Sequence, residues 1–268
     1  MPDHADPTPD LAAVPRRPRA WAWSALGLHL AVAAAWWQLG WRWGLPLLLA
    51  LHLAFVWGTL RPGSRLFGPV RCAFPAAGRE AWLTIDDGPS DDTAAILDLL
   101  DAHGATATFF LVGERAAARP GLVREILARG HGIGNHSHTH PQARFWALGP
   151  RAMRREILDC QRTLAAIAGS PPRWFRAVVG HANPFVHAPL REAGLSRLAW
   201  SARGFDAVEA DPARVAARIA RDLRPGAIVL LHEGAPHGRS VEIVRAVLAR
   251  LAAEGYRMRA PEPARPSA

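Results

Sequence analysis

The order of apolar and polar positions divides the chain into an apolar N-terminal part and a longer part in which two periodicities alternate. Residues 21–41 and 43–60 form two apolar segments without an acidic residue, separated by Arg42. Each segment has about the length that spans the hydrocarbon core of a bilayer. Seven of the eleven tryptophans fall between residues 21 and 57, several of them near the segment ends, as in an aromatic belt. The pattern predicts a transmembrane helical hairpin over residues 20–60.

Two other interpretations of this apolar part fit the sequence less well. A secretory signal peptide has one shorter apolar stretch followed by a cleavage site of small residues, whereas this stretch is long and doubled. A pair of buried core helices would leave the concentration of tryptophans unexplained. We therefore expect residues 20–60 to contact membrane lipid.

From about residue 80, short β-rich runs alternate with amphipathic stretches of helical period. The expected strands are 81–86, 106–112, 132–136, 174–179, 196–200 and 226–232, and the expected helices are 91–103, 114–129, 148–168, 183–193, 211–223 and 239–254. This alternation predicts an α/β fold with a parallel sheet. Six or seven units in this length indicate a distorted (β/α) barrel of about seven strands, complete or incomplete, preceded by the transmembrane hairpin.

The same patterns divide the chain into five parts. Residues 1–19, rich in Pro, Asp, Ala and Arg, read as a disordered tail. The hairpin follows over 20–60, a linker over 61–79, the α/β domain over 80–260 and a second tail over 261–268.

Composition excludes some classes of function and leaves others open. The chain has 268 residues, a formal charge of +9 and only two cysteines, Cys72 and Cys160, which are too few for a disulfide framework. A basic chain of this kind suits an anionic membrane or a nucleic acid. The arginines are spread over the whole length rather than gathered in runs, so we expect no nucleic-acid partner.

Unusual polar residues stand at one end of the expected strands. They are Asp86 and Asp87 after the first strand, His136 at the third, Arg176 in the fourth, Asp206 after the fifth and His232 at the sixth. In a parallel barrel the C-terminal strand ends face the same mouth. Buried charges are costly unless they are paired or ligated, so one shared site is the simplest explanation.

The sharpest signal in this set is the stretch NHSHTH at residues 135–140. His136 and His140 are four residues apart, so one helical turn after the strand would direct both imidazoles the same way. Two imidazoles with one carboxylate, from Asp86 or Asp87, suit Zn²⁺, with Co²⁺ as an alternative, and leave positions open for water. A His cluster alone fits a solvated loop about equally well, but the paired aspartates favour a metal site.

The adjacent carboxylates of Asp86 and Asp87 then have separate uses. One can ligate the metal while the other accepts a proton from the attacking water. Gly88 allows a tight turn beside the ion. An exposed Asx-type turn is a common alternative for the sequence Asp-Asp-Gly, but it would not account for the histidines.

Five short motifs, in order, resemble those of the NodB-homology polysaccharide deacetylases (carbohydrate esterase family 4). TIDDGP resembles the Thr-Phe-Asp-Asp-Gly-Pro motif, and HSHTH matches His-[Ser/Thr]-x-x-His in full. FRAVVG, WSARGFD and IVLLH are similar to the third, fourth and fifth motifs. The resemblance covers roughly residues 80–260.

The resemblance implies a role for each of these polar residues. Asp87, His136 and His140 would hold the metal, Asp86 would be the general base and His232 the general acid. Arg176 would orient Asp86, and Asp206 would support His232. The reaction would be metal-dependent hydrolysis of the N-acetyl or other N-acyl group of an amino sugar, releasing the acid and a free amine.

Two departures from the family pattern fall in the expected substrate pocket. The third motif has Ala177, Val178 and Val179 where the family has two prolines and an aromatic, and it keeps the final glycine as Gly180; Val179 and Gly180 are the expected substrate contacts. The fourth motif has Ala207 after Asp206 where the family has Trp. Neither change touches an expected metal ligand, so the resemblance implies the same chemistry and leaves the substrate open.

Charge around the apolar segments predicts the side of the membrane. Arg16, Arg17 and Arg19 precede them, Arg61, Arg65 and Arg71 follow them, and Arg42 alone lies between. The positive-inside rule then places both chain ends in the cytoplasm and the catalytic domain on the cytoplasmic face of the inner membrane, with the periplasmic face as the alternative. A lipid-linked sugar would be the substrate on the cytoplasmic side and a polysaccharide on the other. A non-catalytic carbohydrate-binding or membrane-surface protein is the competing function.

Overall fold

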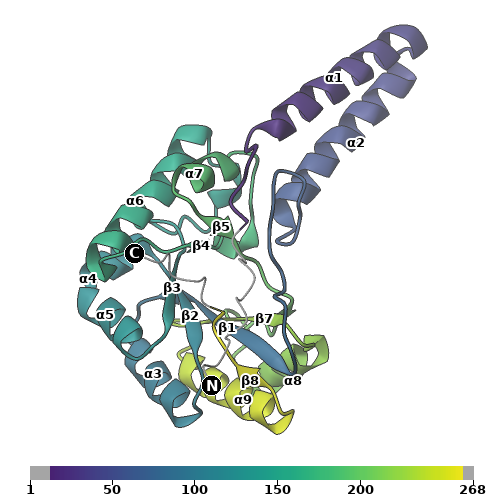
Figure 1. Cartoon of the computed structure of the whole chain (residues 1–268). Helices are drawn as coiled ribbons and strands as arrows, with labels where there is room; N and C mark the ends of the chain where they lie inside the picture. The colour runs from purple at the N-terminus through teal and green to yellow at the C-terminus, as the bar shows by residue number, and fades with distance from the viewer. Residues whose placement is uncertain (1–12, 262–268) are drawn as a thin grey trace, which may run out of the picture.

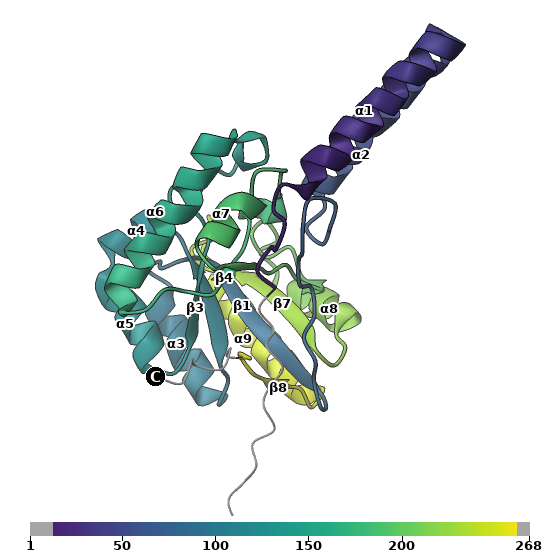
Figure 2. The same cartoon turned by 45° about the horizontal axis from the view of Figure 1, so that its top comes forward.

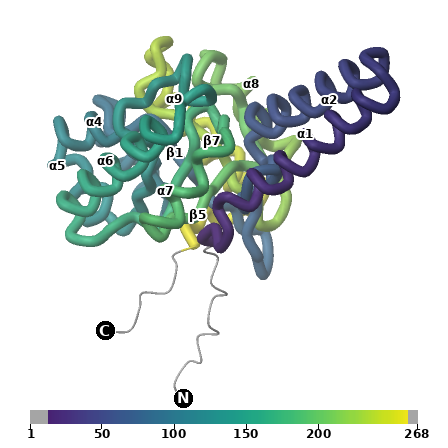
Figure 3. Tube along the Cα trace, turned by 90° about the horizontal axis from the view of Figure 1, so that it is seen from above, coloured from purple at the N-terminus to yellow at the C-terminus, as the bar shows by residue number. Residues whose placement is uncertain are grey.

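The computed structural model describes residues 13–261, and its N-terminal part is a pair of long helices side by side. Helix α1 (Ala20–Leu39) and helix α2 (Trp41–Leu60) are joined at Gly40, whose φ of 78° lies in the region that favours glycine. The pair projects away from the rest of the molecule (Figure 1). Seen from above, it extends to one side of the α/β domain (Figure 3).

Most side chains of this hairpin are exposed, and most of the others are half-buried. Helix α1 has no buried residue, and in α2 only Gly44, Gly58 and Thr59 are buried. Within residues 13–261, one helix, Trp41–Leu60, is long and apolar enough to cross a bilayer. The helical hairpin of the sequence prediction is therefore present, while its insertion into a membrane stays a prediction.

The α/β domain is built on a parallel sheet that curls into an open half-barrel (Figure 2). Its strands are β1 (Glu80–Gly88), β2 (Ala107–Leu111), β3 (Gly132–Asn135), β4 (Trp174–Phe175), β5 (Ser196–Arg197), β6 (Ala202–Arg203), β7 (Ala227–His232) and β8 (Arg257–Met258). The order is β5-β4-β3-β2-β1-β7-β6, and β8 pairs with the start of β1. No strand pairing of the described residues joins β5 to β6, so the barrel is incomplete.

Helices cover the outer face of this sheet. They are α3 (Thr93–Ala102), α4 (Gly113–Ala118), α5 (Pro120–Ala128), α6 (Pro150–Ala168), α7 (His187–Glu192), α8 (Pro212–Asp222) and α9 (Ser240–Ala253), with short 3-10 turns η1 (Phe145–Ala147) and η2 (Val178–Gly180). Strand alternation sends Ala81, Leu83 and Ile85 of β1 into the core beneath the helices. Trp82 joins a second cluster that fills the inside of the half-barrel.

The elements differ from the sequence prediction in several places, and the expected strand over 196–200 and helix over 183–193 are shortened to Ser196–Arg197 and His187–Glu192. The expected helix over 114–129 is two helices, because Pro120 lacks an N–H and begins a new helix. The expected strand over 174–179 pairs only at Trp174–Phe175, after which the chain turns. Strands β6 and β8 were not expected, since two-residue strands carry too little pattern to recognise.

The hairpin is joined to the domain by direct contacts. The backbone N–H of Ala182 donates to the carbonyl of Thr59 at the end of α2 (3.0 Å). Arg197 donates to the carbonyls of Pro62 and Ser64 at 2.8 and 2.9 Å. The expected linker over 61–79 is thus packed against the domain in this region.

The two expected tails lie largely outside the described residues, which exclude 1–12 and 262–268. The described part of the first tail, residues 13–19, leads into α1 beside α7. There Arg191 donates to the carbonyl of Pro15 at 3.3 Å.

Candidate active site

The polar residues expected from the sequence surround one cavity of about 200 Å³ at the C-terminal ends of the strands. Its lining includes Asp86, Asp87, His136, His140, Val179, Gly180, Asp206 and His232. Arg176 lies beneath it, fully buried. Asp86 and Asp87 lie at the end of β1 and His232 at the end of β7, and the others come from the segments that follow β3, β4 and β6. They meet because parallel strands end at the same edge of the sheet.

A bulge at the end of β1 explains how two neighbouring aspartates serve one site. Adjacent side chains of a regular strand point to opposite faces. Here Asp86 pairs with Phe110 of β2 and Gly88 with the next residue, so Asp87 is an extra residue in β1. Its φ of 73° is in the left-handed region. The bulge therefore brings Asp87 to the cavity that Asp86 also faces.

Asp87, His136 and His140 present three ligand atoms that lie within 4.8 Å of one another. Oδ1 of Asp87 is 3.4 Å from Nε2 of His136 and 2.9 Å from Nε2 of His140. Nδ1 of His136 lies 2.9 Å from the carbonyl of Arg176, an acceptor that fixes the proton on Nδ1 and leaves the lone pair of Nε2 facing Asp87.

Two further observations show that this triad fits a cation. Oδ1 of Asp87 is buried and accepts no hydrogen bond from the described residues. Burial opposes ionisation of this carboxyl, yet the two imidazoles hold the pKa of Asp87 below its ordinary value. A buried carboxylate oxygen facing two imidazole nitrogens is the donor set of a divalent metal such as Zn²⁺.

The segment between the two histidine ligands is a loop rather than the helical turn expected from their spacing. Ser137 and His140 have φ values of 70° and 54°, which no α-helix contains. The carboxylate of Glu156 accepts hydrogen bonds from the N–H groups of His138 and Thr139, at 3.0 and 2.9 Å, and holds the loop. The ligands converge because of this loop geometry, and His138 points elsewhere, toward Gly113.

Asp86 is held by a fully buried arginine. Arg176 donates from one nitrogen to Oδ1 of Asp86 (2.7 Å) and to the hydroxyl of Thr84 (2.7 Å), and its guanidinium lies 4.2 Å from the centre of the Phe110 ring. The other oxygen, Oδ2, is 3.8 Å from Nε2 of His136. One oxygen of Asp86 is thus fixed, and the other is directed toward the metal triad.

His232 is held by Asp206 in a second pair. Asp206 accepts from the backbone N–H of His232 at 2.6 Å and lies 3.1 Å from its Nδ1, which leaves Nε2 free to act in the cavity. Burial alone would lower the pKa of this imidazole. The charge and hydrogen bond of Asp206 outweigh it and raise the pKa of His232 to about 9. The imidazole is therefore a proton donor at neutral pH.

The remaining wall of the cavity is largely apolar. Val179 and Gly180 line it as the sequence predicts, and Val179, with φ of 55°, is 44% exposed. Trp200, Arg203, Phe205, Ala207 and Val208 complete the wall from the segment around β6. Phe205 and Val208 are 47% and 83% exposed. The cavity thus has an open apolar rim.

Sequence reasoning missed residues that hold the end of β1 in place. Glu233 accepts hydrogen bonds from the hydroxyls of Ser90 and Thr93, beneath the turn at Gly88. Burial raises the pKa of Glu233 above its ordinary value, and these hydrogen bonds oppose the rise. Arg115 donates to the carbonyl of Asp87. Only the position of Glu233, directly after His232, could have pointed to it.

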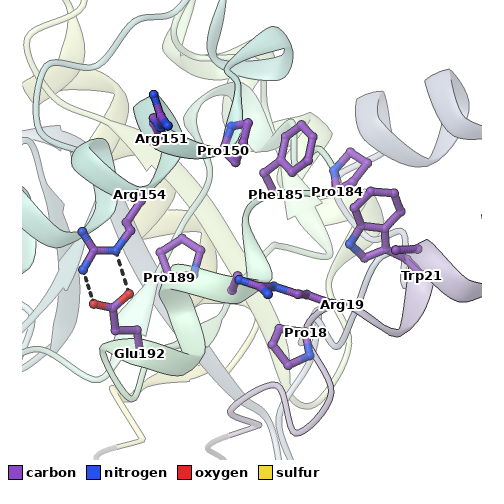
Figure 4. A pocket seen from close by; sticks show the side chains of 12 residues that line it. Pro18, Arg19, Trp21, Pro150, Arg151, Arg154, Pro184, Phe185, Pro189 and Glu192 are labelled. Carbon is purple, nitrogen blue, oxygen red and sulfur yellow. Dashed lines mark hydrogen bonds and ion pairs between the residues drawn. The ribbon is translucent and has the colours of Figure 1, made fainter.

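A larger cavity of about 560 Å³ lies where α1 meets the domain (Figure 4). Pro18, Trp21, Phe185 and Pro189 form apolar walls. Its one carboxylate, Glu192, is paired with Arg154. No histidine lines it and no described cluster of metal-ligating residues lies there, so the hydrolytic groups are confined to the smaller cavity.

Comparisons with known proteins agree with this geometry. A family model described as polysaccharide deacetylase matches residues 75–198. A chitooligosaccharide deacetylase of Bradyrhizobium sp. (strain ANU 289) is 37% identical over 162 residues, which are 60% of this chain and 73% of the relative.

Solved structures share the same fold. A peptidoglycan N-acetylglucosamine deacetylase superposes with a TM-score of 0.65 at 28% identity, covering 71% of this chain and 89% of that one. A Bacillus anthracis protein described as a CE4 family pseudoenzyme has a TM-score of 0.64 at 25% identity, covering 71% and 66%. The same fold is therefore found in an enzyme and in a pseudoenzyme. The fold alone does not establish activity, so the inference of activity has to rest on the residues of the site.

Proposed function

Because the chain belongs to the polysaccharide deacetylase family, we propose that it hydrolyses the N-acetyl group of an amino sugar in a glycan, with a divalent metal ion held by Asp87, His136 and His140. The observation that carries the proposal is the joint presence in one cavity of three ligand atoms, a carboxylate whose second oxygen is directed toward them, and an imidazole paired with a buried aspartate. A non-catalytic binding protein would have no need of the last two groups.

The residues divide the work of amide hydrolysis between them. Asp86 accepts the proton of the attacking water on Oδ2, while Arg176 keeps Oδ1 fixed. His232 donates a proton from Nε2 to the leaving nitrogen, and Asp206 keeps the ring charged and oriented. A divalent ion bound by the triad would supply Lewis-acid polarisation of the acyl carbonyl and of the attacking water.

Release of acetate tests the proposed reaction. Purified protein in detergent, loaded with Zn²⁺ or Co²⁺, is incubated with N-acetylated chitooligosaccharide, and the released acetate and free amine are measured. The two products should appear in equal amounts. We expect release that a chelator abolishes and added metal restores. Release that persists after complete removal of metal would overturn the metal-dependent mechanism, and absence of release from any N-acetylated glycan would favour the non-catalytic alternative.

We further propose that the hairpin α1–α2 is embedded in the inner membrane, with the catalytic domain on its cytoplasmic face and a lipid-linked sugar as its substrate. The outward apolar side chains of both helices and the arginines at both ends of the hairpin support this placement. Fusion of a cytoplasmic reporter, and separately of a periplasmic reporter, to residue 268 tests it. A signal from the periplasmic reporter alone would reverse the placement and make an envelope polysaccharide the substrate.

A further inference from the structure

We propose that Arg203 is a substrate-binding residue of the catalytic cavity and that it recognises a phosphate group attached to the amino sugar. This inference rests on the proposed deacetylase function and narrows its substrate class. Arg203 lines the cavity together with the metal triad and His232. None of the roles described above uses it.

The guanidinium of Arg203 is held in place by aromatic rings rather than by an acid. It lies 4.1 Å from the centre of the Phe205 ring and 5.7 Å from that of Trp200. Among residues 13–261 no carboxylate forms an ion pair with it. Burial lowers the pKa of Arg203, and no neighbouring acid opposes this. Stacking on aromatic faces leaves the N–H donors at the edge of a guanidinium available to a ligand.

The acidic residues of this region have other partners. Asp86 pairs with Arg176, Asp206 with His232, and Asp87 with the two imidazoles of the metal triad. Glu209, on the same segment as Arg203, pairs instead with Arg218 at 3.2 Å. A positive charge in a partly enclosed cavity without a protein partner is most simply satisfied by an anionic group of the substrate.

Phosphate is favoured over other anions by the surroundings of the cavity. Guanidinium groups bind phosphate through paired hydrogen bonds. Gly180, on the cavity wall, is packed against Pro62, directly after the hairpin, and Ala182 bonds to Thr59 of α2. The cavity is thus connected to the apolar hairpin through one short loop. A sugar linked through phosphate to a lipid would place its anion at Arg203 and its chain beside these apolar elements.

The test compares substrates that differ only in charge. The soluble probes are N-acetylglucosamine phosphorylated on its anomeric oxygen, its uncharged methyl glycoside, and the matching carboxylate-bearing glycoside. The fourth probe is N-acetylglucosamine joined by a phosphate ester to a polyisoprenol in detergent. For the intact protein we expect kcat/KM about 10- to 100-fold higher for the phosphorylated sugar than for the methyl glycoside, from one charge-assisted contact.

Arg203→Gln should lower kcat/KM for the phosphorylated sugar about 10- to 100-fold more than for the methyl glycoside, mainly through KM, so that the preference between the two probes disappears. The matched control is Arg214→Gln, which removes one charge from α8 at a residue that pairs with Asp211 outside the cavity; it should retain the preference. Equal losses toward the charged and uncharged probes in Arg203→Gln would show a purely structural role and overturn the inference. A higher kcat/KM for the carboxylate probe than for the phosphorylated sugar would also overturn the inference.

Binding separates failure of this inference from failure of the proposed function. Calorimetry with the phosphorylated sugar requires no turnover, and Arg203→Gln should weaken its binding by a similar factor. Binding that depends on Arg203 without acetate release from any probe would keep the anion site and reject the deacetylase. Acetate release that does not depend on Arg203 would support the deacetylase and reject the phosphate site. Preference of the polyisoprenol probe over the soluble phosphate identifies a lipid-linked source, and equal use of both identifies a soluble sugar phosphate.

Discussion

The hairpin and the catalytic domain place apolar and polar side chains in opposite ways. In the domain, Trp82, Phe109 and Phe110 are fully buried, while in the hairpin Trp37 is 91% exposed and Leu53 67% exposed. Conversely, the domain buries Asp86 and Arg176, groups that are costly to remove from water. Each region thus violates one rule of a water-soluble fold.

The two violations have different meanings. Buried charge in the domain is compensated inside the chain, by the ion pair of Asp86 with Arg176 and by that of Asp206 with His232. The exposed apolar surface of the hairpin has no such compensation among the described residues. Exposing it to water costs about 25 cal/mol per Å², which supports our proposal that membrane lipid covers it. Hydrolysis in the domain depends on single residues, whereas the membrane insertion that we propose for the hairpin would depend on the character of a whole surface.

The largest effect should follow from removing a metal ligand. Asp87→Asn or His136→Ala should lower kcat/KM by more than about 10⁴-fold, since the Lewis-acid contribution is lost together with the ion. Metal content, measured after purification from zinc-containing medium, should fall from about one ion per chain to near none. His103→Ala, which changes an exposed histidine on the outside of the domain, is the control and should retain both metal and activity. Full metal occupancy in Asp87→Asn and His136→Ala would mean that other residues are the ligands.

Asp86→Asn should distinguish the role of Asp86 as the general base from the role of Asp87 as a metal ligand. The amide keeps the shape of the carboxylate but cannot take a proton, so kcat should fall on the order of 10² to 10⁴-fold. Metal content should stay near that of the unchanged protein, in contrast to Asp87→Asn. Asp91→Asn, in an exposed pair with Arg119, is the matched control. Retention of full turnover by Asp86→Asn would exclude it as the base.

These two aspartates also show how far the sequence alone could lead. Their carboxylates and the two histidines could be assigned to one site, because strand ends of a parallel sheet converge. The sequence Asp-Asp-Gly does not predict the β-bulge that brings Asp87 to that site. The spacing of His136 and His140 predicted a helical turn, whereas the structure has a loop held by Glu156. Hydrogen bonds between residues distant in sequence determine these local conformations, and the periodicity of apolar residues does not predict such hydrogen bonds.

Arg176→Met should affect stability more than a surface change can. The side chain is fully buried, and its loss leaves Asp86 without its partner, at a cost of about 3 to 5 kcal/mol in the free energy of unfolding. Denaturant titration measures this loss. The double variant Asp86→Asn/Arg176→Met should be less destabilised than the sum of the two single variants, because no unpaired charge remains. Additive losses would show that the pair does not compensate its own burial.

The pH dependence of catalysis should depend on Asp206. The folded pKa of His232, about 9, lies above its ordinary value of 6.5, so the pair stabilises the protein fully below about pH 6.5 and loses this contribution as the pH rises through 9. The acid form needed for catalysis is lost over the same range. Because a bound cation would lower the pKa in both proteins, the prediction concerns their difference. In Asp206→Asn the alkaline limb of kcat/KM should move down by about 1 unit or more. If the alkaline limb of the Asp206→Asn profile did not move, the limb would report the titration of a group other than His232.

The smallest effect on catalysis should come from the hairpin, where the expected change is in location. Leu30 lies near the middle of α1 and is 62% exposed. An arginine at the centre of a membrane-spanning helix costs about 2.5 to 3.5 kcal/mol, whereas on a helix facing water it costs almost nothing. Leu30→Arg should therefore lower the fraction of protein that resists alkaline extraction from membranes, while Leu30→Ile should not. In detergent both variants should hydrolyse soluble chitooligosaccharide within about two-fold of the unchanged protein, because Leu30 does not line the catalytic cavity. Equal extraction of all three proteins would show that the exposed face of α1 is covered by something other than lipid, and it would remove the contrast between the two regions.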